Sequence, residues 1–148
     1  MKRVAVTGIG VVAPIGCGRQ PFWDALLAGR SGIGPVTSFD TSRFPVHIGA
    51  QVRDFIPDAH LHRQRSDSMG RASQFAVAAA GMALADARID LASVDRQLAG
   101  VSLGTTSGEP LLVERYNDSR KAGGGIRIQR VPPAVSLQRH SQPCRHRV

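Results

Sequence analysis

Hydrophobic and polar positions along the first thirty residues predict a strand followed by a helix. The β-branched apolar run over residues 3 to 8 predicts a strand buried on both faces. Pro21 suits the first position of a helix, and Gly29 suits the position just after its end. The apolar side chains of this helix share one face at helical spacing and are expected in the core: Phe22, Trp23, Leu26 and Leu27.

The middle and the later part of the chain continue this alternation. Residues 31 to 40 contain two glycines and a proline and predict a loop, and Val46 to Val52 alternates weakly, as a strand would. Val101 to Gly104 predicts another buried strand, which leads into the turn TTSGEP. Strands and helices in this order indicate an α/β layered domain.

Residues 67 to 88 give the clearest helix pattern. Asp67 or Ser68 is expected to cap its N-terminus. The body of the helix is apolar nearly all round, so other elements are expected to cover it. Its many alanines, together with Gly70 and Gly81, allow neighbouring backbones to come close.

The opening stretch TGIGVVAPIG contains a possible dinucleotide-binding pattern, because Gly8, Gly10 and Ala13 fit the spacing G-x-G-x-x-A. Such a site needs the third small residue in the first turn of a helix and an acidic residue about 20 positions further on. The helix here starts several residues later, Asp24 falls inside it, and Asp40 falls in a loop. The glycines are therefore expected to serve a tight turn at a strand end, and no cofactor is predicted.

Charge is distributed unevenly along the 148 residues, whose net charge is +8. Residues 1 to 125 hold fourteen Lys or Arg and all eleven acids, whereas residues 126 to 148 hold five Arg and no acid. The high isoelectric point therefore owes much to the tail, whose composition is typical of a disordered basic segment. Five arginines without interleaved aromatic residues predict only nonspecific attraction to nucleic acid.

Cysteine and histidine positions give no metal site. Two cysteines do not make a disulfide framework, which fits a reducing compartment such as the cytoplasm. Cys17 is expected as a small buried or half-buried thiol. His60 and His62 form an H-x-H pair without a third ligand and are expected to be exposed to solvent. The spacing of the remaining candidates, His140, Cys144 and His146, matches no common zinc pattern. The longest apolar run is too short to span a membrane.

Four blocks of sequence carry a resemblance to a known family: KRVAVTGIGVVAPIG, FWDALLAGRSGIGPVTSFD, SQFAVAAAGMALADA and GVSLGTTSGE. In this order and spacing they resemble the start of β-ketoacyl-acyl carrier protein synthases of the elongating type, from Lys2 to about Gly124. The resemblance implies part of the first of two α/β halves of a thiolase-like fold. It also implies acyl carrier protein and a homodimer partner as binding partners, in fatty acid or polyketide synthesis.

The implied chemistry is a decarboxylating Claisen condensation, in which a cysteine thiolate takes an acyl group and two histidines stabilise an enolate. The family's nucleophile follows a motif like T-A-C-S-S-G, which neither Cys17 nor Cys144 matches, and the histidines near residues 47 to 62 match neither catalytic histidine. No catalytic residue is therefore carried over, and the chain is expected to be inactive alone. By resemblance, Ser107 and Gly108 lie in a segment that lines the acyl pocket.

The resemblance fails in the tail. Family members continue after a VPPAV-like stretch into an Ala-rich helix, whereas VPPAV is followed here by SLQRHSQPCRHRV, a composition that GC-rich codons give when read out of frame. We expect a frameshifted or truncated ketosynthase whose last native residue lies near Val135. The alternatives are a short non-catalytic partner protein, a nucleic-acid binder that uses the basic tail, and a dinucleotide enzyme.

Overall fold

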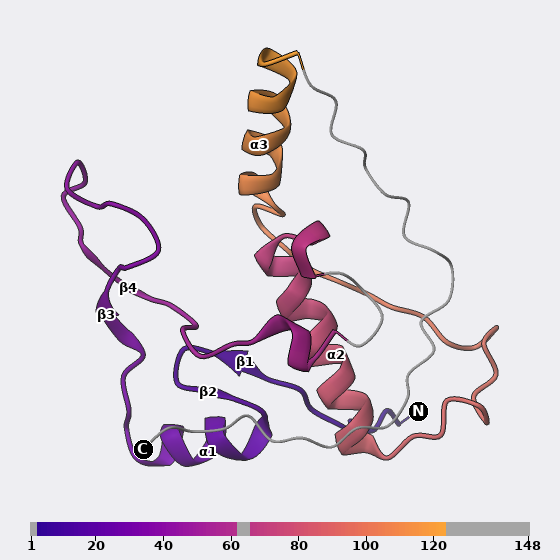
Figure 1. Ribbon diagram of the computed structural model, residues 1–148. Coiled ribbons are helices and arrows are strands. Elements are labelled where there is room, and N and C mark those ends of the chain that lie inside the picture. The colour runs from indigo at the N-terminus through magenta and orange to yellow at the C-terminus, as the bar shows by residue number, and fades with distance from the viewer. Residues whose placement is uncertain (1–2, 62–65, 124–148) are drawn as a thin grey trace.

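The computed structural model describes residues 3–61 and 66–123 (Figure 1). Three α-helices organise this part of the chain: α1 (Arg19–Leu27), α2 (Arg71–Ala87) and α3 (Pro110–Lys121). Two short 3₁₀ turns, Pro57–Ala59 and Ser66–Ser68, precede α2. The strands form two separate antiparallel pairs: β1 (Val12–Ala13) with β2 (Gly16–Cys17), and β3 (Ile33–Pro35) with β4 (Ile48–Ala50).

The β1–β2 hairpin lies between the opening segment and α1. Val12 pairs with Cys17 and Ala13 with Gly16, so Pro14 and Ile15 make the turn. A Cβ added at Gly16 would lie 2.7 Å from the backbone nitrogen of Phe22, and the hairpin therefore packs directly on α1. Cys17 is half-buried in this hairpin, as the sequence predicts.

The β3–β4 hairpin projects away from the helices in Figure 1. Gly34 pairs with Gly49 and Pro35 with Ile48, and the N–H of Val36 extends the pairing to the carbonyl of His47 at 2.9 Å. β4 confirms the strand predicted within residues 46 to 52. β3 corrects the prediction of a loop, because glycine and proline are acceptable in a strand that pairs on one side only.

Helix α1 ends where the sequence predicts. Gly29 has a φ of 62°. The N–H of Arg30 donates to the carbonyl of Ala25 at 2.9 Å, and that of Gly29 donates to Leu26 at 3.1 Å, which together make a Schellman motif. The expected core face is wrong, since Trp23 and the two leucines are at least half exposed and only Ala25 of this helix is buried.

Helix α2 confirms the long helix but starts later than predicted. Gly70 is its N-cap residue and supplies no side-chain cap, while Asp67 and Ser68 belong to the preceding 3₁₀ turn. The helix ends at Ala87, and Arg88 follows as the C-cap residue in the left-handed conformation. Ala78 is its one buried residue, so the expected complete covering of this helix is not present.

The two buried strands predicted at residues 3–8 and 101–104 are wrong for the described structure. Neither segment is in a strand, and the side chains of Val4 and Val101 are 95% and 97% exposed. A strand forms only when a neighbour takes its backbone hydrogen bonds. Residues 3–61 and 66–123 supply no such neighbour for either segment.

The core of this part of the chain is small. Its buried apolar residues are Ala25, Phe55, Leu61 and Ala78. Phe55 packs edge-on against Phe75 of α2, with ring centroids 5.0 Å apart. Within the part of the chain that the structure describes, no helix combines the length and the apolar character needed to cross a bilayer.

Candidate functional site

The two glycines of the opening motif lie against α2. A Cβ added at Gly8 would come 2.7 Å from the backbone nitrogen of Ala87, and one at Gly10 would come 2.8 Å from that of Ala83. Glycine is therefore needed for close approach between this segment and the helix. The expected role in a tight turn is corrected, because Pro14 and Ile15 make that turn.

This arrangement argues against a dinucleotide site at the motif. A pyrophosphate needs the glycine backbone to be open and a helix N-terminus to follow it directly. Here the side of Gly8 and Gly10 that a Cβ would occupy faces α2, and the β1–β2 hairpin separates both glycines from the start of α1.

Asp86, near the C-terminal end of α2, connects three elements. Its Oδ2 accepts a hydrogen bond from the backbone N–H of Ile9 at 3.1 Å. Its Oδ1 lies 3.1 Å from Nε of Arg19, the first residue of α1. The opening segment and α1 are therefore both fixed to the same carboxylate.

Arg71, the first residue of α2, lies over two aromatic rings. Its guanidinium carbon is 4.9 Å from the ring centroid of Phe55 and 4.6 Å from that of Phe75. Its Nη2 also donates to the carbonyl of Val52 at 3.2 Å. These contacts fix the segment that contains Phe55 to the start of α2.

His60 belongs to the same aromatic cluster. Its ring stacks on Phe55 with a centroid separation of 5.3 Å and an interplanar angle of 6°. It is half-buried, which corrects the expectation of a solvent-exposed histidine, because stacking removes one ring face from water. His62, the other member of the predicted pair, lies outside the described residues.

The described residues contain no group of three or more His, Cys, Asp or Glu side chains that could hold a metal ion. Nδ1 of His47 lies 3.1 Å from Oγ1 of Thr41. The tail candidates His140, Cys144 and His146 fall outside the described ranges.

The turn that contains Ser107 and Gly108 leads into the start of α3. Gly108 has a φ of 62°, and its N–H donates to Oγ1 of Thr105 at 3.1 Å. Both Ser107 and Gly108 are exposed. Glu109 follows as the N-cap residue of α3, and Oε1 of its carboxylate accepts a hydrogen bond from the backbone N–H of Ser73 at 2.6 Å. The turn is thereby placed beside the N-terminus of α2.

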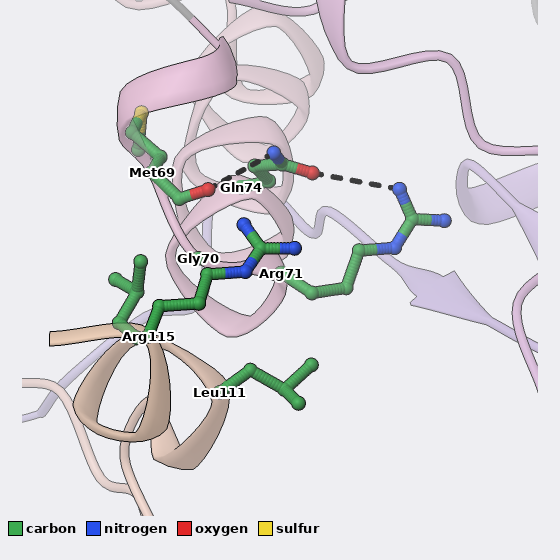
Figure 2. Close-up of a pocket in the computed structure, with 7 residues that line it drawn as sticks. Met69, Gly70, Arg71, Gln74, Leu111 and Arg115 are labelled. Carbon is green, nitrogen blue, oxygen red and sulfur yellow. Dashed lines mark hydrogen bonds between the residues drawn. The ribbon is translucent and has the colours of Figure 1, made fainter. Parts of the chain in front are cut away.

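A pocket of about 180 Å³ lies at this junction, between the start of α2 and the first turns of α3 (Figure 2). It is lined by Met69, Gly70, Arg71, Gln74, Leu111, Leu112 and Arg115. Nε2 of Gln74 donates to the carbonyls of Ser66 and Met69, at 2.8 and 3.2 Å, and holds the 3₁₀ turn against the helix. Ser107 and Gly108 precede this junction in the chain and are not among the lining residues.

Comparison with known proteins identifies the family of this arrangement. The model of the family described as "Beta-ketoacyl synthase, N-terminal domain" matches residues 1–141. The chain belongs to the β-ketoacyl synthase family. A solved structure described as the ishigamide ketosynthase/chain length factor has a TM-score of 0.72 and 39% identity, over 80% of this chain and 30% of that one. The chain is thus part of an α/β fold of the thiolase-like type, as its resemblance to the family implies.

Curated β-ketoacyl synthases from two kinds of biosynthesis are similar to this chain. The 3-oxoacyl-[acyl-carrier-protein] synthase 2 of Synechocystis is 40% identical over 107 residues, which is 72% of this chain and 26% of that protein. The tetracenomycin ketoacyl synthase beta subunit of Streptomyces glaucescens is 40% identical over 105 residues, 71% of this chain and 26% of that subunit. This chain therefore spans less than a third of the length of these relatives.

Three residues with a clear structural role were missed by sequence reasoning, namely Arg71, Asp86 and Glu109. The partners of the two acids lie 77 and 36 positions away along the chain, so no local pattern reveals them. The only local signal is the Glu-Pro pair at positions 109 and 110, which is typical of a helix start.

Proposed function

We propose that this chain supplies the N-terminal part of a β-ketoacyl-acyl carrier protein synthase and does not catalyse condensation alone. The observation that carries the proposal is the structural similarity to the ishigamide ketosynthase/chain length factor over 80% of the chain. The reaction joins an acyl group, held as a thioester on a cysteine, to the enolate left when a malonyl thioester loses CO2. The substrates are acyl and malonyl thioesters of a carrier protein.

We expect no condensation by this chain alone because of the groups that the reaction requires. The acyl thioester requires a thiolate with a lowered pKa, and the enolate requires hydrogen-bond donors such as histidine. Neither Cys17 nor Cys144 lies in a T-A-C-S-S-G context, and His60 stacks on Phe55. No reacting group is therefore assigned to this chain.

Exposed apolar segments support the need for further protein. The side chains of Val4 and Val6 are 95% and 83% exposed, and those of Val101 and Leu103 are 97% and 71% exposed. Extended apolar segments of this kind pair and become buried when adjacent strands are present. The proposed complete assembly is cytoplasmic and contains a second ketosynthase copy.

Ser107 and Gly108 are the residues we assign to the acyl pocket of that assembly. The assignment is supported by the match of the Gly104–Glu109 turn to the family's pocket segment and by the exposure of both residues. A Cβ added at Gly108 would meet no atom beyond its chain neighbours within 4 Å, so there is room beside the turn for a substrate chain.

A non-catalytic partner is the second candidate function. The tetracenomycin alpha subunit is 39% identical over 127 residues, and the beta subunit is 40% identical over 105 residues. The chain is therefore similar to both kinds of subunit at nearly the same identity, over 85% of its length for the alpha subunit and 71% for the beta subunit. A partner of this kind would increase product formation by a complete ketosynthase without binding acyl groups covalently.

The domain boundary is also part of the proposal, with residues 1–125 as the ketosynthase segment and 126–148 as a separate tail. The family match extends to residue 141 and so continues into the proposed tail, whereas the resemblance of the sequence blocks ends near Gly124. The match therefore does not mark this boundary. Sequencing the coding DNA from codon 120 onward and translating every frame tests the boundary. An Ala-rich helix and a T-A-C-S-S-G-like motif in another frame would support a frameshift, and their absence would contradict it.

A chimeric enzyme tests the function directly. The matching segment of the Synechocystis synthase is replaced by residues 1–123, and CO2 release and 3-ketoacyl product are measured with acyl and malonyl carrier proteins. We expect activity from the chimera and none from the 148-residue chain. A chimera of parental size without activity, or a chain active alone, would refute the proposal.

The same chimera tests the pocket assignment. Ser107→Trp is expected to reduce the use of long acyl groups more than that of short ones, because the indole occupies space beside the turn. Ser93→Trp, in an exposed loop, is the matched control and should leave the chain-length preference unchanged. Equal effects of the two substitutions would remove Ser107 from the pocket.

A further inference from the structure

We infer that Glu109 is a positioning residue that anchors the turn carrying Ser107 and Gly108 to the N-terminus of α2. The contact is the hydrogen bond of 2.6 Å from the backbone N–H of Ser73 to its Oε1, which is partly buried. Ser73 is the third residue of α2, and its N–H has no acceptor within the helix. A carboxylate here also interacts favourably with the positive end of the helix dipole.

The residue at position 70 shows how closely the Glu109 carboxylate approaches the start of α2. Gly70 has φ −71° and ψ 164°, a backbone conformation open to any residue, so the conformation does not require glycine. A Cβ at this position would overlap the Glu109 carboxylate and lie 2.7 Å from Oε1. The space that a side chain would need at Gly70 is therefore occupied by the acceptor from Glu109.

Glu109 acts at two helix starts. Its carboxylate caps α2, while its backbone carbonyl accepts hydrogen bonds from the N–H groups of Leu112 and Val113, at 3.0 and 3.2 Å, in the first turn of α3. The turn before it is closed by the Gly108 to Thr105 hydrogen bond. A shift of Glu109 would consequently displace the turn and α3 together.

The start of α2, to which Glu109 binds, is itself held in place by several contacts. Arg71 lies over the rings of Phe55 and Phe75, and Gln74 holds Met69 and Ser66. Anchoring the turn here sets where Ser107 lies relative to a packed part of the molecule. The consequence for acyl binding rests on the proposed function, whereas the anchor itself does not.

Amide hydrogen exchange of the ¹⁵N-labelled full chain tests the anchor residue by residue. Glu109→Ala should increase the exchange rate of the Ser73 amide roughly tenfold or more, as expected for loss of a hydrogen bond to a charged group. Glu109→Gln keeps an acceptor oxygen and should give a smaller increase. Gly70→Ala should resemble Glu109→Ala, because the added methyl group displaces the carboxylate.

Two control variants separate this effect from a general loss of helix. Glu114→Ala changes an exposed acid on α3, and Gly81→Ala adds a methyl group where nothing lies within 4 Å. Neither should increase Ser73 exchange. An unprotected Ser73 amide in the parent chain, or unchanged exchange in both Glu109 variants, would overturn the inference. The measurement uses no substrate, so an inactive chimera would refute the proposed function and leave the anchor standing.

Discussion

Replacing Gly10 with alanine tests whether the opening glycines serve close packing against α2. The added Cβ would overlap the carbonyl oxygen of Ala79 and lie 2.8 Å from the backbone nitrogen of Ala83. Ordinary carbon contacts are about 3.5 to 4.0 Å, so the segment must move from the helix by about 1 Å. Such a movement also stretches the 3.1 Å hydrogen bond from Ile9 to Asp86 beyond the usual range.

The expected cost follows from these two effects. Overpacking costs about 1 to 3 kcal/mol, and loss of a hydrogen bond to a charged group costs about 1.5 to 3 kcal/mol. Because one displacement causes both effects and relieves part of the overpacking, the two costs do not add in full. We expect a total loss in the free energy of unfolding of about 2 to 4 kcal/mol. Gly81→Ala, where the space is open, should instead stabilise α2 by about 1 kcal/mol.

Urea unfolding followed by circular dichroism at 222 nm measures both variants against the parent chain. Opposite changes in the midpoint are expected, downward for Gly10→Ala and upward for Gly81→Ala. A Gly10→Ala chain as stable as the parent would refute close packing as the role of this glycine. Titration with NAD(H) is expected to leave the midpoint of each chain unchanged, and a stabilisation by NAD(H) that Gly10→Ala abolishes would restore the dinucleotide interpretation.

Two further predictions concern carboxylates outside the pocket. Asp86→Ala should lower the free energy of unfolding by about 1.5 to 3 kcal/mol, because it removes both the acceptor of the Ile9 N–H and the partner of Arg19. Arg19→Ala removes the ion pair alone and should cost only about 0 to 1 kcal/mol, since the Arg19 side chain is 60% exposed. Equal losses in urea unfolding would contradict this ranking. The backbone N–H of Ser42, and then its hydroxyl, hold the pKa of Asp40 below its ordinary value of 3.8. The stability that this turn contributes is therefore present above the ordinary pKa of Asp40 and is lost as the pH falls through its lower pKa in the folded chain. In an NMR titration, the pKa of Asp40 should rise partway toward 3.8 in Ser42→Ala, which keeps the backbone N–H. A pKa of 3.8 for Asp40 in the parent chain would refute this prediction.

The elements that depend on nearby residues were predicted well from the sequence. Gly29 ends α1 through a left-handed turn, and the apolar pattern of residues 67 to 88 gives α2, because both signals lie within the helix and its flanks. Burial was predicted poorly. Val4 and Val101 have the pattern of buried strands, but burial depends on neighbouring strands that the described part of the chain does not provide.

The candidate site shows the same division. The turn that holds Ser107 and Gly108 was found from its resemblance to a family segment, and their role in an acyl pocket stays a prediction. The side chain that holds this turn, Glu109, was not predicted, because its partner Ser73 lies on another element. Tertiary hydrogen bonds of this kind leave no periodic pattern in a sequence.

Asp86 is unfavourable for helix α2 in isolation but favourable for the packing of α2 in the whole chain. It lies in the last turn of the helix, where the partial negative charge of the carbonyl groups disfavours an acid by about 0.3 to 1 kcal/mol. A peptide of residues 71–87 alone should therefore become more helical when Asp86 is replaced by lysine. In the whole chain the same substitution removes the acceptor of Ile9 and places two cations together at Arg19. One substitution is thus expected to have opposite effects in the isolated helix and in the whole chain, because the carboxylate of Asp86 serves the docking of α2 rather than the helix itself.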